Sequence, residues 1–510
     1  VADRRYSGGC ILSPGMILEG LLRHTEVLQL QGSSNAEIRS LAYDSRQAGA
    51  GCLFFAIEGE RADGHRFVGQ ALERGAAGVV SEREAPPGFG AVWVRVGKVR
   101  RALAEISRAF YGGPDSQLTL VGITGTNGKT TTAYLVQSVL EAAGMSTGLV
   151  GTIEYRLAGR SAPAHHTTPE SLDVAAGLAE HLQAGGSAAV MEVSSHALAQ
   201  ERTWGFRFAA AVFTNLTGDH LDYHRDMETY FAAKRRLFEG LGAPPPELGV
   251  INRDDAWGKR LLEVPQPRQI TYGVESNAQV KPKHFTLSRE GIRATINTLH
   301  GKLDVESALL GRPNLQNILA AAAVTEGLGV DRDSIQQGIA NLRQVPGRFE
   351  RICEGQPFIV LVDYAHTHDA LRNALATARE LTRNRVVVVF GCGGDRDRTK
   401  RPLMGEVAGS MSDSVVLTSD NPRSEDPILV MNDVLVGLQK TARQYVAEVD
   451  REKAIRQALE QAREGDVVLI AGKGHETYQV LKEATIAFDD REAARRILRE
   501  MGFGGQPARE

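Results

Sequence analysis

The stretch Val121-Gly-Ile-Thr-Gly-Thr-Asn-Gly-Lys-Thr-Thr131 decides the fold, because it predicts a phosphate-binding loop between a strand and a helix. An apolar, β-rich run over residues 118–124 precedes the loop, and a helical pattern with one apolar face follows and is expected to stop at Gly144. Backbone N–H groups at a helix N-terminus attract anions, Lys129 adds a positive charge, and the Thr130 hydroxyl is a candidate magnesium ligand. The stretch therefore predicts an ATP or GTP site.

The spacing of this loop differs from that of the commonest nucleotide-binding loop. Ile123, and not glycine, lies five residues before Gly128, so the glycine-containing part is the compact segment 125–131. A glycine-rich turn that only joins a strand to a helix is the structural alternative. The Lys-Thr pair at the expected place argues against that alternative.

The length of the chain predicts three domains, because 510 residues exceed what one hydrophobic core supports. We expect a small α/β domain over residues 1–114 and the phosphate-binding domain over 115–346, with turn-forming residues between them. Residues 347–510 form the third predicted domain. It contains continuous apolar strands at 358–362, 386–390, 414–417 and 466–470, which are typical of a parallel sheet covered on both faces.

Composition and charge narrow the class of protein. A net charge of -3 and a pI near 6.6 argue against a dedicated nucleic-acid binder. No apolar run approaches the roughly 18 to 20 residues of a membrane span, and the first residues lack a signal pattern. The cysteines lie far apart without metal-ligand spacing, which favours a reducing compartment, and we expect a cytoplasmic protein. They are Cys10, Cys52, Cys353 and Cys392.

Two further segments place polar side chains after apolar strands, where open α/β sheets bind ligands. In the segment 190–196, Glu192 is a candidate magnesium ligand, and its apolar neighbours argue against a surface carboxylate. The segment 214–224 gathers two acids and two histidines within six residues, which suggests contact with a cation or a phosphate. Caps of helices are the alternative for that cluster, which consists of Asp219, His220, Asp222 and His224.

Lys234 lies on the apolar face of a helix predicted over residues 226–240. Burial of an unpaired ammonium is costly, so this lysine should reach a polar site, lose its proton or be chemically modified. Snorkelling to the edge of the helix is the alternative, and the sequence alone does not decide between them.

Taken together, six segments in this order resemble the ATP-dependent Mur ligases of peptidoglycan synthesis over nearly the whole chain. They are residues 125–131, 191–196, 219–222 with Lys234 downstream, 347–350, 363–366 and 472–476. Three more segments are similar to the branch of that family that adds the third residue of the stem peptide. These are Asp44-Ser-Arg46, Gly391-Cys-Gly-Gly-Asp-Arg-Asp-Arg398 and Asp420-Asn-Pro-Arg423.

The resemblance implies a three-domain enzyme with a domain for the UDP part of its substrate, a central P-loop-type ATPase and a C-terminal Rossmann-like domain. It implies addition of meso-diaminopimelate to UDP-MurNAc-L-Ala-D-Glu through an acyl phosphate, with ATP and Mg²⁺, by a monomer without a nucleic-acid partner. The implied UDP-substrate residues are Tyr43, Ser45, Arg61, His166, Thr167, Thr168, Ser194, Gln200 and Arg202. The implied diaminopimelate residues are Arg396, Asp420, Asn421, Pro422, Arg423, Gly472 and Glu476.

The resemblance also implies the nucleotide and metal residues, with Lys234 carbamylated so that it becomes a carboxylate ligand. The catalytic residues would be Lys129, Lys234, His220 and Arg348, and the metal ligands Thr130, Glu192, His220 and modified Lys234. The ATP residues would be Gly125, Thr126, Asn127, Gly128, Lys129, Thr130, Thr131, Asn317, Arg348, Asp363 and His366. Two departures from the family pattern, His368 and Pro313, flank this expected site.

Arg423 bears on the choice of amine, because its planar guanidinium suits a carboxylate that diaminopimelate has and lysine lacks. A surface ion pair is the structural alternative for Arg423. Rival functions are a lysine-adding sibling, a folylpolyglutamate synthase that shares the central ATPase, and a nucleotide-gated module without turnover. Arg423 and the first domain disfavour the two ligases, and the presence of Lys129, Glu192 and Lys234 disfavours the inactive module.

Overall fold

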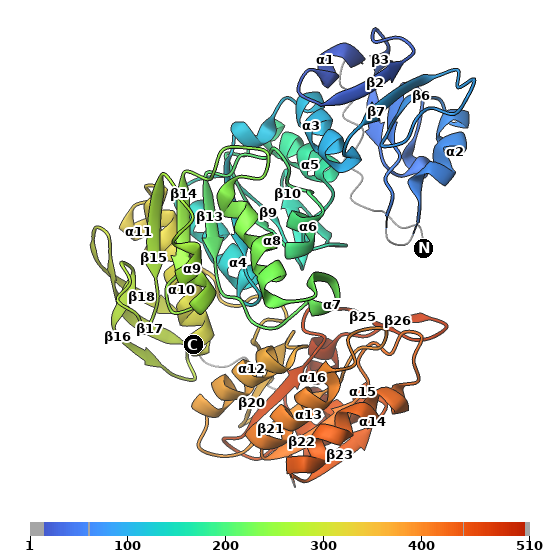
Figure 1. Ribbon diagram of the computed structural model, residues 1–510. Helices are drawn as coiled ribbons and strands as arrows, with labels where there is room; N and C mark the ends of the chain where they lie inside the picture. Colours follow the sequence, from blue (N-terminus) through green and yellow to red (C-terminus); the bar gives the residue numbers. More distant parts are fainter. Residues whose placement is uncertain (1–14, 60–61, 442, 505–510) are drawn as a thin grey trace.

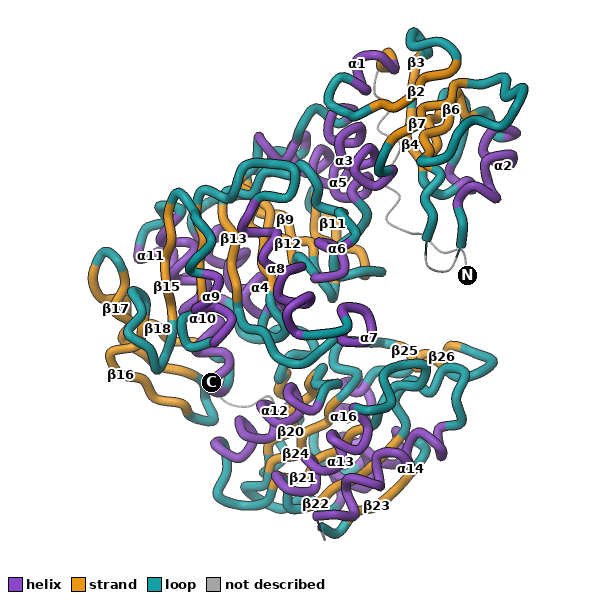
Figure 2. The backbone as a smooth tube through the Cα atoms, in the orientation of Figure 1, coloured by secondary structure: helices purple, strands orange, loops and turns teal. Residues whose placement is uncertain are grey.

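The computed structural model describes residues 15–59, 62–441 and 443–504, and it has three α/β parts that follow one another along the molecule (Figure 1). In each part helices flank a central sheet (Figure 2). The α/β class with parallel-rich sheets is confirmed. The predicted boundaries at 114 and 346 fall between the sheets and stay predictions.

The N-terminal part contains a five-stranded sheet in the order β2-β7-β6-β5-β4, parallel except for β2. Its strands are β2 (Val27–Gln31), β4 (Ser40–Ala42), β5 (Cys52–Phe55), β6 (Ala76–Ser81) and β7 (Val92–Val96). Its helices are α1 (Leu18–Leu22), α2 (Val68–Glu73) and α3 (Val99–Phe110), beside the short pair β1 (Met16–Ile17) and β3 (Glu37–Ile38). Helix α3 also packs on α5 (Ser171–Gln183) of the central part and so joins the two parts.

The central part is built on an eight-stranded sheet in the order β11-β10-β9-β12-β8-β13-β14-β15. The six strands from β9 to β15 in this order are parallel, and β10 and β11 form an antiparallel edge. The strands are β8 (Thr119–Thr124), β9 (Thr147–Val150), β10 (Glu154–Leu157), β11 (Arg160–Pro163), β12 (Ala188–Glu192), β13 (Ala210–Phe213), β14 (Leu248–Asn252) and β15 (Arg268–Tyr272).

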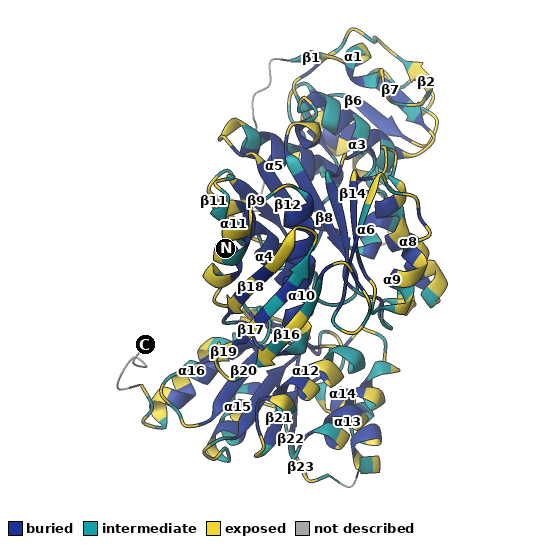
Figure 3. Ribbon diagram, turned by 90° about the vertical axis from the view of Figure 1, so that its left-hand side faces the viewer, coloured by how far each residue is buried: buried dark blue, intermediate teal, exposed yellow. Residues whose placement is uncertain are grey.

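Helices cover both faces of this sheet, which is why its strands read as continuous apolar runs and are buried (Figure 3). One face packs against α4 (Lys129–Ala142), α10 (Gly311–Gly327) and α11 (Arg332–Asn341). The other packs against α5 (Ser171–Gln183), α6 (Ser195–Ala199), α8 (Met227–Glu239) and α9 (Ala256–Leu261). The predicted helix after the phosphate loop is α4, and Gly144 follows its end with φ +79°.

A three-stranded antiparallel sheet extends the central part, and the sequence reading did not anticipate it. It consists of β16 (Lys281–Leu287), β17 (Ile292–Thr298) and β18 (Gly301–Ser307). Its inward residues alternate along the chain, with Ile292, Ala294 and Ile296 in β17 joining the core under α10 and α11. This period of two was the available signal.

The C-terminal part has a six-stranded sheet in the order β19-β20-β24-β21-β22-β23, parallel except for β19. The strands are β19 (Glu350–Ile352), β20 (Ile359–Asp363), β21 (Val386–Phe390), β22 (Ser414–Thr418), β23 (Tyr445–Glu448) and β24 (Val467–Ala471). The four predicted strands thus form within one residue of the expected positions. A hairpin of β25 (Tyr478–Val480) and β26 (Thr485–Ala487) follows β24.

Helices cover both faces of the C-terminal sheet as well, as expected for a doubly wound unit. One face carries α12 (His368–Glu380), α13 (Lys400–Met411) and α14 (Pro427–Leu438), and the other α15 (Arg451–Glu460) and α16 (Asp490–Glu500). Within the part of the chain that the structure describes, no helix has both the length and the apolar character of a membrane crossing.

Candidate active site

A cavity of about 500 Å³ lies where the central part meets the C-terminal part. Its walls come from the phosphate loop, the end of β12, the start of α10, the segment around Arg348 and α12. All the predicted nucleotide residues except Gly125 line it, together with Glu192, His220, Thr167 and Ser194. The structure therefore brings the predicted nucleotide residues together across the junction of two parts.

Two glycines let the phosphate loop adopt its shape between β8 and α4. Gly125 has φ +148°, and a Cβ atom there would lie 1.9 Å from Thr214 Oγ1. Gly128 has φ +84° at the start of α4, and a Cβ atom there would lie 2.5 Å from Asn317 Oδ1. The Asn127 N–H donates to Asn215 Oδ1 at 2.9 Å, which fixes the middle of the loop. The compact spacing thus reflects close packing of the loop on its neighbours.

Lys129 folds back across its own loop. Its Nζ donates to the carbonyl oxygens of Gly125 at 3.0 Å and Thr126 at 2.8 Å. Burial lowers the pKa of the Lys129 ammonium, Glu192 opposes that shift and Arg348 adds to it. The ammonium lies on the cavity wall, where phosphate oxygens could replace the carbonyl partners.

Glu192 is buried at the end of β12 and lies in a network of hydroxyl and amide donors. Its Oε2 accepts from Thr130 Oγ1 at 3.0 Å, and its Oε1 accepts from the Thr152 N–H at 2.8 Å. A surface role for this carboxylate is therefore excluded. Thr152 was not identified from the sequence, where no motif marks it.

Lys234 is buried on α8, and its Nζ donates to the Gly125 carbonyl oxygen at 2.8 Å. The Tyr230 ring lies 4.6 Å from the same Nζ. Burial lowers the pKa of Lys234 well below its ordinary value, and the nearby Lys129 lowers it further. The side chain thus reaches a polar site in the protein interior, which excludes snorkelling and favours a neutral, nucleophilic amine.

The acid and histidine cluster after β13 divides into two pairs. Asp219 and His220 line the cavity, whereas Asp222 is exposed and His224 is buried with its Nε2 2.9 Å from Ser195 Oγ. Burial lowers the pKa of His220 to about 3, with Asp219 opposing the shift. His220 is therefore a neutral imidazole at neutral pH. The expected contact with a cation or phosphate is open to only the first pair.

The donor atoms around this wall suit magnesium. Among the residues that the structure describes, no group of three or more His, Cys, Asp or Glu side chains could hold a metal ion. Magnesium takes few protein carboxylates and keeps substrate phosphates and waters as its other ligands. The direct contact between the Thr130 hydroxyl and the Glu192 carboxylate beside the phosphate loop fits that preference.

Residues after the second predicted boundary complete the cavity. Arg348 donates to Thr130 Oγ1 at 3.2 Å, and its guanidinium lies 4.4 Å from the Tyr364 ring. Asp363 accepts from the N–H groups of Phe349 at 2.8 Å and Ala365 at 2.9 Å, so its carboxylate holds the Arg348 turn. Burial raises the pKa of Asp363, and Arg348 opposes the shift.

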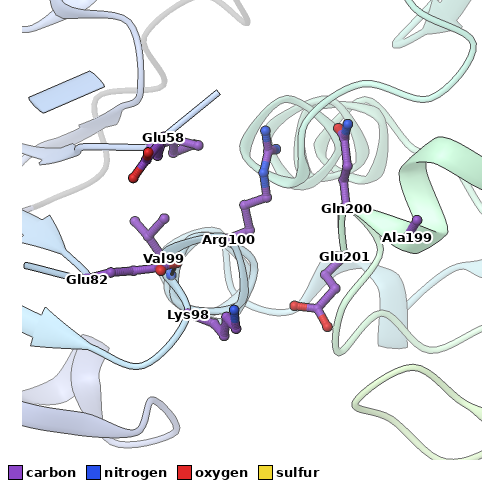
Figure 4. Close-up of a pocket in the computed structure, with 9 residues that line it drawn as sticks. Glu58, Glu82, Lys98, Val99, Arg100, Ala199, Gln200 and Glu201 are labelled. Carbon is purple, nitrogen blue, oxygen red and sulfur yellow. Dashed lines mark hydrogen bonds between the residues drawn. The ribbon is translucent and has the colours of Figure 1, made fainter. Parts of the chain in front are cut away.

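The predicted UDP-substrate residues form a connected line from Glu192 toward the N-terminal part. Thr168 Oγ1 donates to the Glu192 carbonyl oxygen at 2.8 Å and accepts from the Ser194 N–H at 3.0 Å. Arg202 donates to the Thr168 carbonyl oxygen at 2.8 Å and to Gln200 Oε1 at 2.9 Å. The line continues to a second cavity, of about 430 Å³, which Gln200 lines together with Glu58 and Glu82 of the N-terminal part (Figure 4).

The remaining residues of this predicted set have other partners. Tyr43 donates to Asp173 Oδ2 at 2.6 Å across the junction of the first two parts, and Ser45 is buried against Gln70. The backbone N–H of His166 donates to the Tyr155 hydroxyl at 3.1 Å. Arg61 lies outside the described residues. Lys98 and Arg100 on the second cavity were not identified from the sequence, because isolated basic residues carry no motif.

The predicted diaminopimelate residues lie on the loops that follow β22 and β24, except Arg396, which lies on the loop after β21. Asn421 Nδ2 donates to Glu476 Oε2 at 2.8 Å, and buried Lys473 donates to the same atom at 3.0 Å. Arg423 has φ +52° and donates to the Gly394 carbonyl oxygen at 2.6 Å. Arg396 is exposed. A Cβ atom added to Gly393 would lie 3.8 Å from Arg396 Cγ and 2.8 Å from the Arg423 guanidinium, so both side chains lie near Gly393.

The two departures from the family pattern occupy different places. Pro313 lines the large cavity in the first turn of α10. His368 begins α12 and lies 3.6 Å from Asp369, beside the cavity residue Thr367. Both therefore flank the cavity, as expected.

Comparison with known proteins connects these features to one family. Three family models match the chain: "Mur ligase family, catalytic domain" at residues 37–111, "Mur ligase middle domain" at 123–325 and "Mur ligase, glutamate ligase domain" at 347–474. A UDP-N-acetylmuramoyl-L-alanyl-D-glutamate–2,6-diaminopimelate ligase from Solibacter usitatus is 55% identical over 470 residues, which cover 92% of this chain and 95% of that protein.

Solved structures of similar proteins also match the chain. A structure of a UDP-N-acetylmuramoyl-L-alanyl-D-glutamate–2,6-diaminopimelate ligase matches with a TM-score of 0.68 and 32% identity, covering 96% of this chain and 99% of that one. The MurF ligase of Thermotoga maritima in complex with ADP has a TM-score of 0.61 at 20% identity, covering 91% and 96%, and this likeness concerns the fold.

A pH prediction follows from His475, which packs 5.0 Å from the Tyr364 ring. Burial, reinforced by Arg348, lowers the pKa of His475 from 6.5 to about 3. Between those values the unfolded chain binds one more proton than the folded chain, so stability falls on acidification. When the pH is lowered from 7 to about 5, we expect the free energy of unfolding to fall by about 1 to 2 kcal/mol less in His475→Gln than in wild type. Urea unfolding at both pH values measures this, and equal losses in the two proteins would contradict it.

Proposed function

The chain belongs to the Mur ligase family, and on that basis we propose that it adds meso-diaminopimelate to UDP-MurNAc-L-Ala-D-Glu in peptidoglycan biosynthesis, at the expense of ATP. One observation carries the proposal. The cavity that holds the phosphate loop is closed by the part of the chain that carries the 420–423 and 472–476 loops. Nucleotide and amine can therefore reach one reaction centre from two domains.

The proposed division of labour follows the three parts. Residues 1–114 bind the UDP end of the substrate, residues 115–346 bind ATP, and residues 347–510 bind the amino acid. The nucleotide substrates place the reaction in the cytoplasm, where it supplies cell-wall growth, cell shape and division.

The reaction has two steps, because a free carboxylate must be activated before it forms an amide. The γ-carboxylate oxygen of D-glutamate attacks the γ-phosphorus of ATP, the bond to the bridging oxygen breaks, and ADP leaves. The free amine of diaminopimelate then attacks the acyl carbon, and the tetrahedral intermediate collapses with loss of phosphate and a proton. Lys129 and Arg348 orient the phosphates and neutralise their charge, so no protein nucleophile is needed.

Thr130, Glu192 and His220, with Lys234 as a carbamate, are the residues that would hold magnesium. When bound, the metal neutralises charge on the transferring phosphoryl group. Glu192 is held ready by its donors Thr130 and Thr152, and neutral His220 offers a free lone pair. The low pKa of Lys234 supplies the neutral amine that carbamate formation with CO₂ requires.

Arg423 and Glu476 together account for the choice of amine. Arg423 presents a guanidinium for the carboxylate at the far end of diaminopimelate, and Glu476 lies on the facing loop for the amino group at the same end. Lysine offers the amino group without the carboxylate. Bound lysine would leave Arg423 without its partner.

The function is tested by phosphate release with purified protein, ATP, magnesium and UDP-MurNAc-L-Ala-D-Glu, with meso-diaminopimelate or L-lysine offered in parallel. We expect phosphate release and a tripeptide product, identified by mass, with diaminopimelate. Equal or better use of lysine would refute the assigned amine and keep the ligase. The absence of product with either amine would refute the proposed reaction.

Arg423→Ala is expected to lower kcat/KM for diaminopimelate about tenfold to a hundredfold, because a hydrogen bond between charged groups is lost. Use of lysine should not fall, since lysine has no group for Arg423. Arg398→Ala is the matched control, because Arg398 lies near the same loop but pairs with Asp433 at the surface. An equal loss for both amines in Arg423→Ala would contradict the assignment.

Carbamylation of Lys234 predicts an intact protein heavier by one CO₂ in native mass spectrometry. The modification should disappear after acidification and return with bicarbonate near neutral pH, because the buried amine is neutral there. Lys234→Met should abolish it, whereas Lys259→Met on the exposed side of α9 should not. Retention of the added mass in Lys234→Met would place the modification elsewhere.

A further inference from the structure

A buried arginine lies beneath the two loops that carry the proposed amino-acid residues. Arg451 begins α15, Asp490 begins α16, and both side chains are fully buried. Arg451 Nε donates to Asp490 Oδ1 at 2.7 Å, and Nη2 donates to Asp490 Oδ2 at 2.7 Å. A buried ion pair is weak evidence for stability by itself, because desolvation offsets its attraction. What distinguishes this pair is where the other N–H groups of Arg451 donate.

Those donors reach the backbone of both loops. Arg451 Nη1 donates to the Ser419 carbonyl oxygen at 3.2 Å, and Nη2 donates to the Ala471 carbonyl oxygen at 3.0 Å. Ser419 immediately precedes Asp420, and Ala471 immediately precedes Gly472. One guanidinium thus holds the residue before each of the two motifs.

The strands that lead into these loops do not pair with each other. Strand β21 lies between β24 and β22, so the two strands are about 10 Å apart and share no ladder hydrogen bonds. Next to the guanidinium the two loops approach closely. A Cβ atom added to Gly472 would lie 2.5 Å from Asp420 Oδ2 and 3.8 Å from Arg451 Nη2. Arg451 therefore bridges a gap that the sheet itself leaves open.

The spacing of these loops sets the spacing of the groups that would meet the substrate. Asn421 on one loop donates to Glu476 on the other at 2.8 Å, and Lys473 Nζ lies 3.2 Å from Asn421 Oδ1. Arg423 follows Asn421 by two residues. A shift of either loop would thus change the distance between Arg423 and Glu476.

We propose that Arg451, held by Asp490, is a positioning residue that sets the separation of the Arg423 loop from the Glu476 loop and so determines affinity for diaminopimelate. This inference rests on the proposed function. Arg451 has no exposed atoms and acts through the two loops without touching the substrate. A purely structural role would instead change stability and leave the affinity of the folded protein for each substrate unchanged.

Arg451→Lys tests the proposal, because it keeps the charge opposite Asp490 and removes the fork that reaches both carbonyls. We expect KM for diaminopimelate to rise about tenfold or more, since charge-assisted hydrogen bonds to both loops are lost. KM for ATP and for UDP-MurNAc-L-Ala-D-Glu should stay within about twofold, because their proposed residues lie elsewhere. The preference for diaminopimelate over lysine should fall in parallel.

Arg385→Lys is the matched control. Arg385 pairs with buried Asp466 at 2.6 Å at the opposite ends of β21 and β24, so the same substitution there breaks a fork without reaching the loops. We expect all three KM values of this variant to match wild type. A folded Arg451→Lys protein with an unchanged KM for diaminopimelate would overturn the positioning role.

A second variant separates folding from positioning. Asp490→Asn preserves the volume and an acceptor for Arg451 but removes the charge that orients it, and a smaller rise in the same KM is expected. Failure of both variants to fold, with Arg385→Lys folded, would assign the pair to stability and overturn the proposal. Wild-type protein that forms no tripeptide from diaminopimelate would instead overturn the proposed function.

Discussion

Two lysine side chains converge on one carbonyl oxygen, and much of the site depends on that crowding. Lys129 Nζ and Lys234 Nζ lie 3.0 Å and 2.8 Å from the Gly125 oxygen, one arriving from the loop and the other from α8. Two ammonium groups on one buried carbonyl oxygen would repel strongly, and this repulsion is one reason why the pKa of Lys234 is low and its amine neutral. Binding of a polyphosphate supplies negative charge, and carbamylation of Lys234 would change the sign of one partner.

The same charge balance links the central and C-terminal parts. Lys400 at the start of α13 donates to Asp219 Oδ1 at 2.7 Å, and Arg348 reaches Thr130 beside the phosphate loop. Cations from the C-terminal part thus meet acceptors of the central part at the cavity. Ligase chemistry needs the acyl phosphate and the amine to come together, and these contacts join the two parts beside the phosphate loop.

The sequence predicted what depends on local pattern. Continuous apolar runs predicted the four strands of the third part to within a residue, and the predicted phosphate loop at 125–131 lines the large cavity. The sequence did not predict contacts between residues that belong to no recognisable motif. Thr152, Lys400 and Arg451 act through carbonyl or carboxylate partners that are distant in the chain, so only the fold reveals them. The β16–β18 sheet was visible as alternation in the sequence but was not recognised.

Backbone strain explains a further part of what the sequence could not show. His220, Phe349 and Arg423 all have φ near +50°, a region that favours glycine, and neither phenylalanine nor arginine suggests it. Each lies in a segment of the proposed site. Such strain costs of order 1 to 3 kcal/mol per residue and persists only where the surroundings over-determine it. For Phe349, the Asp363 carboxylate supplies that constraint, and for Arg423 the Val480 and Gly394 carbonyl oxygens do. At Phe349 and Arg423 the strained backbone is thus held by hydrogen bonds of the proposed site itself, so relaxing it would also misplace the chemistry.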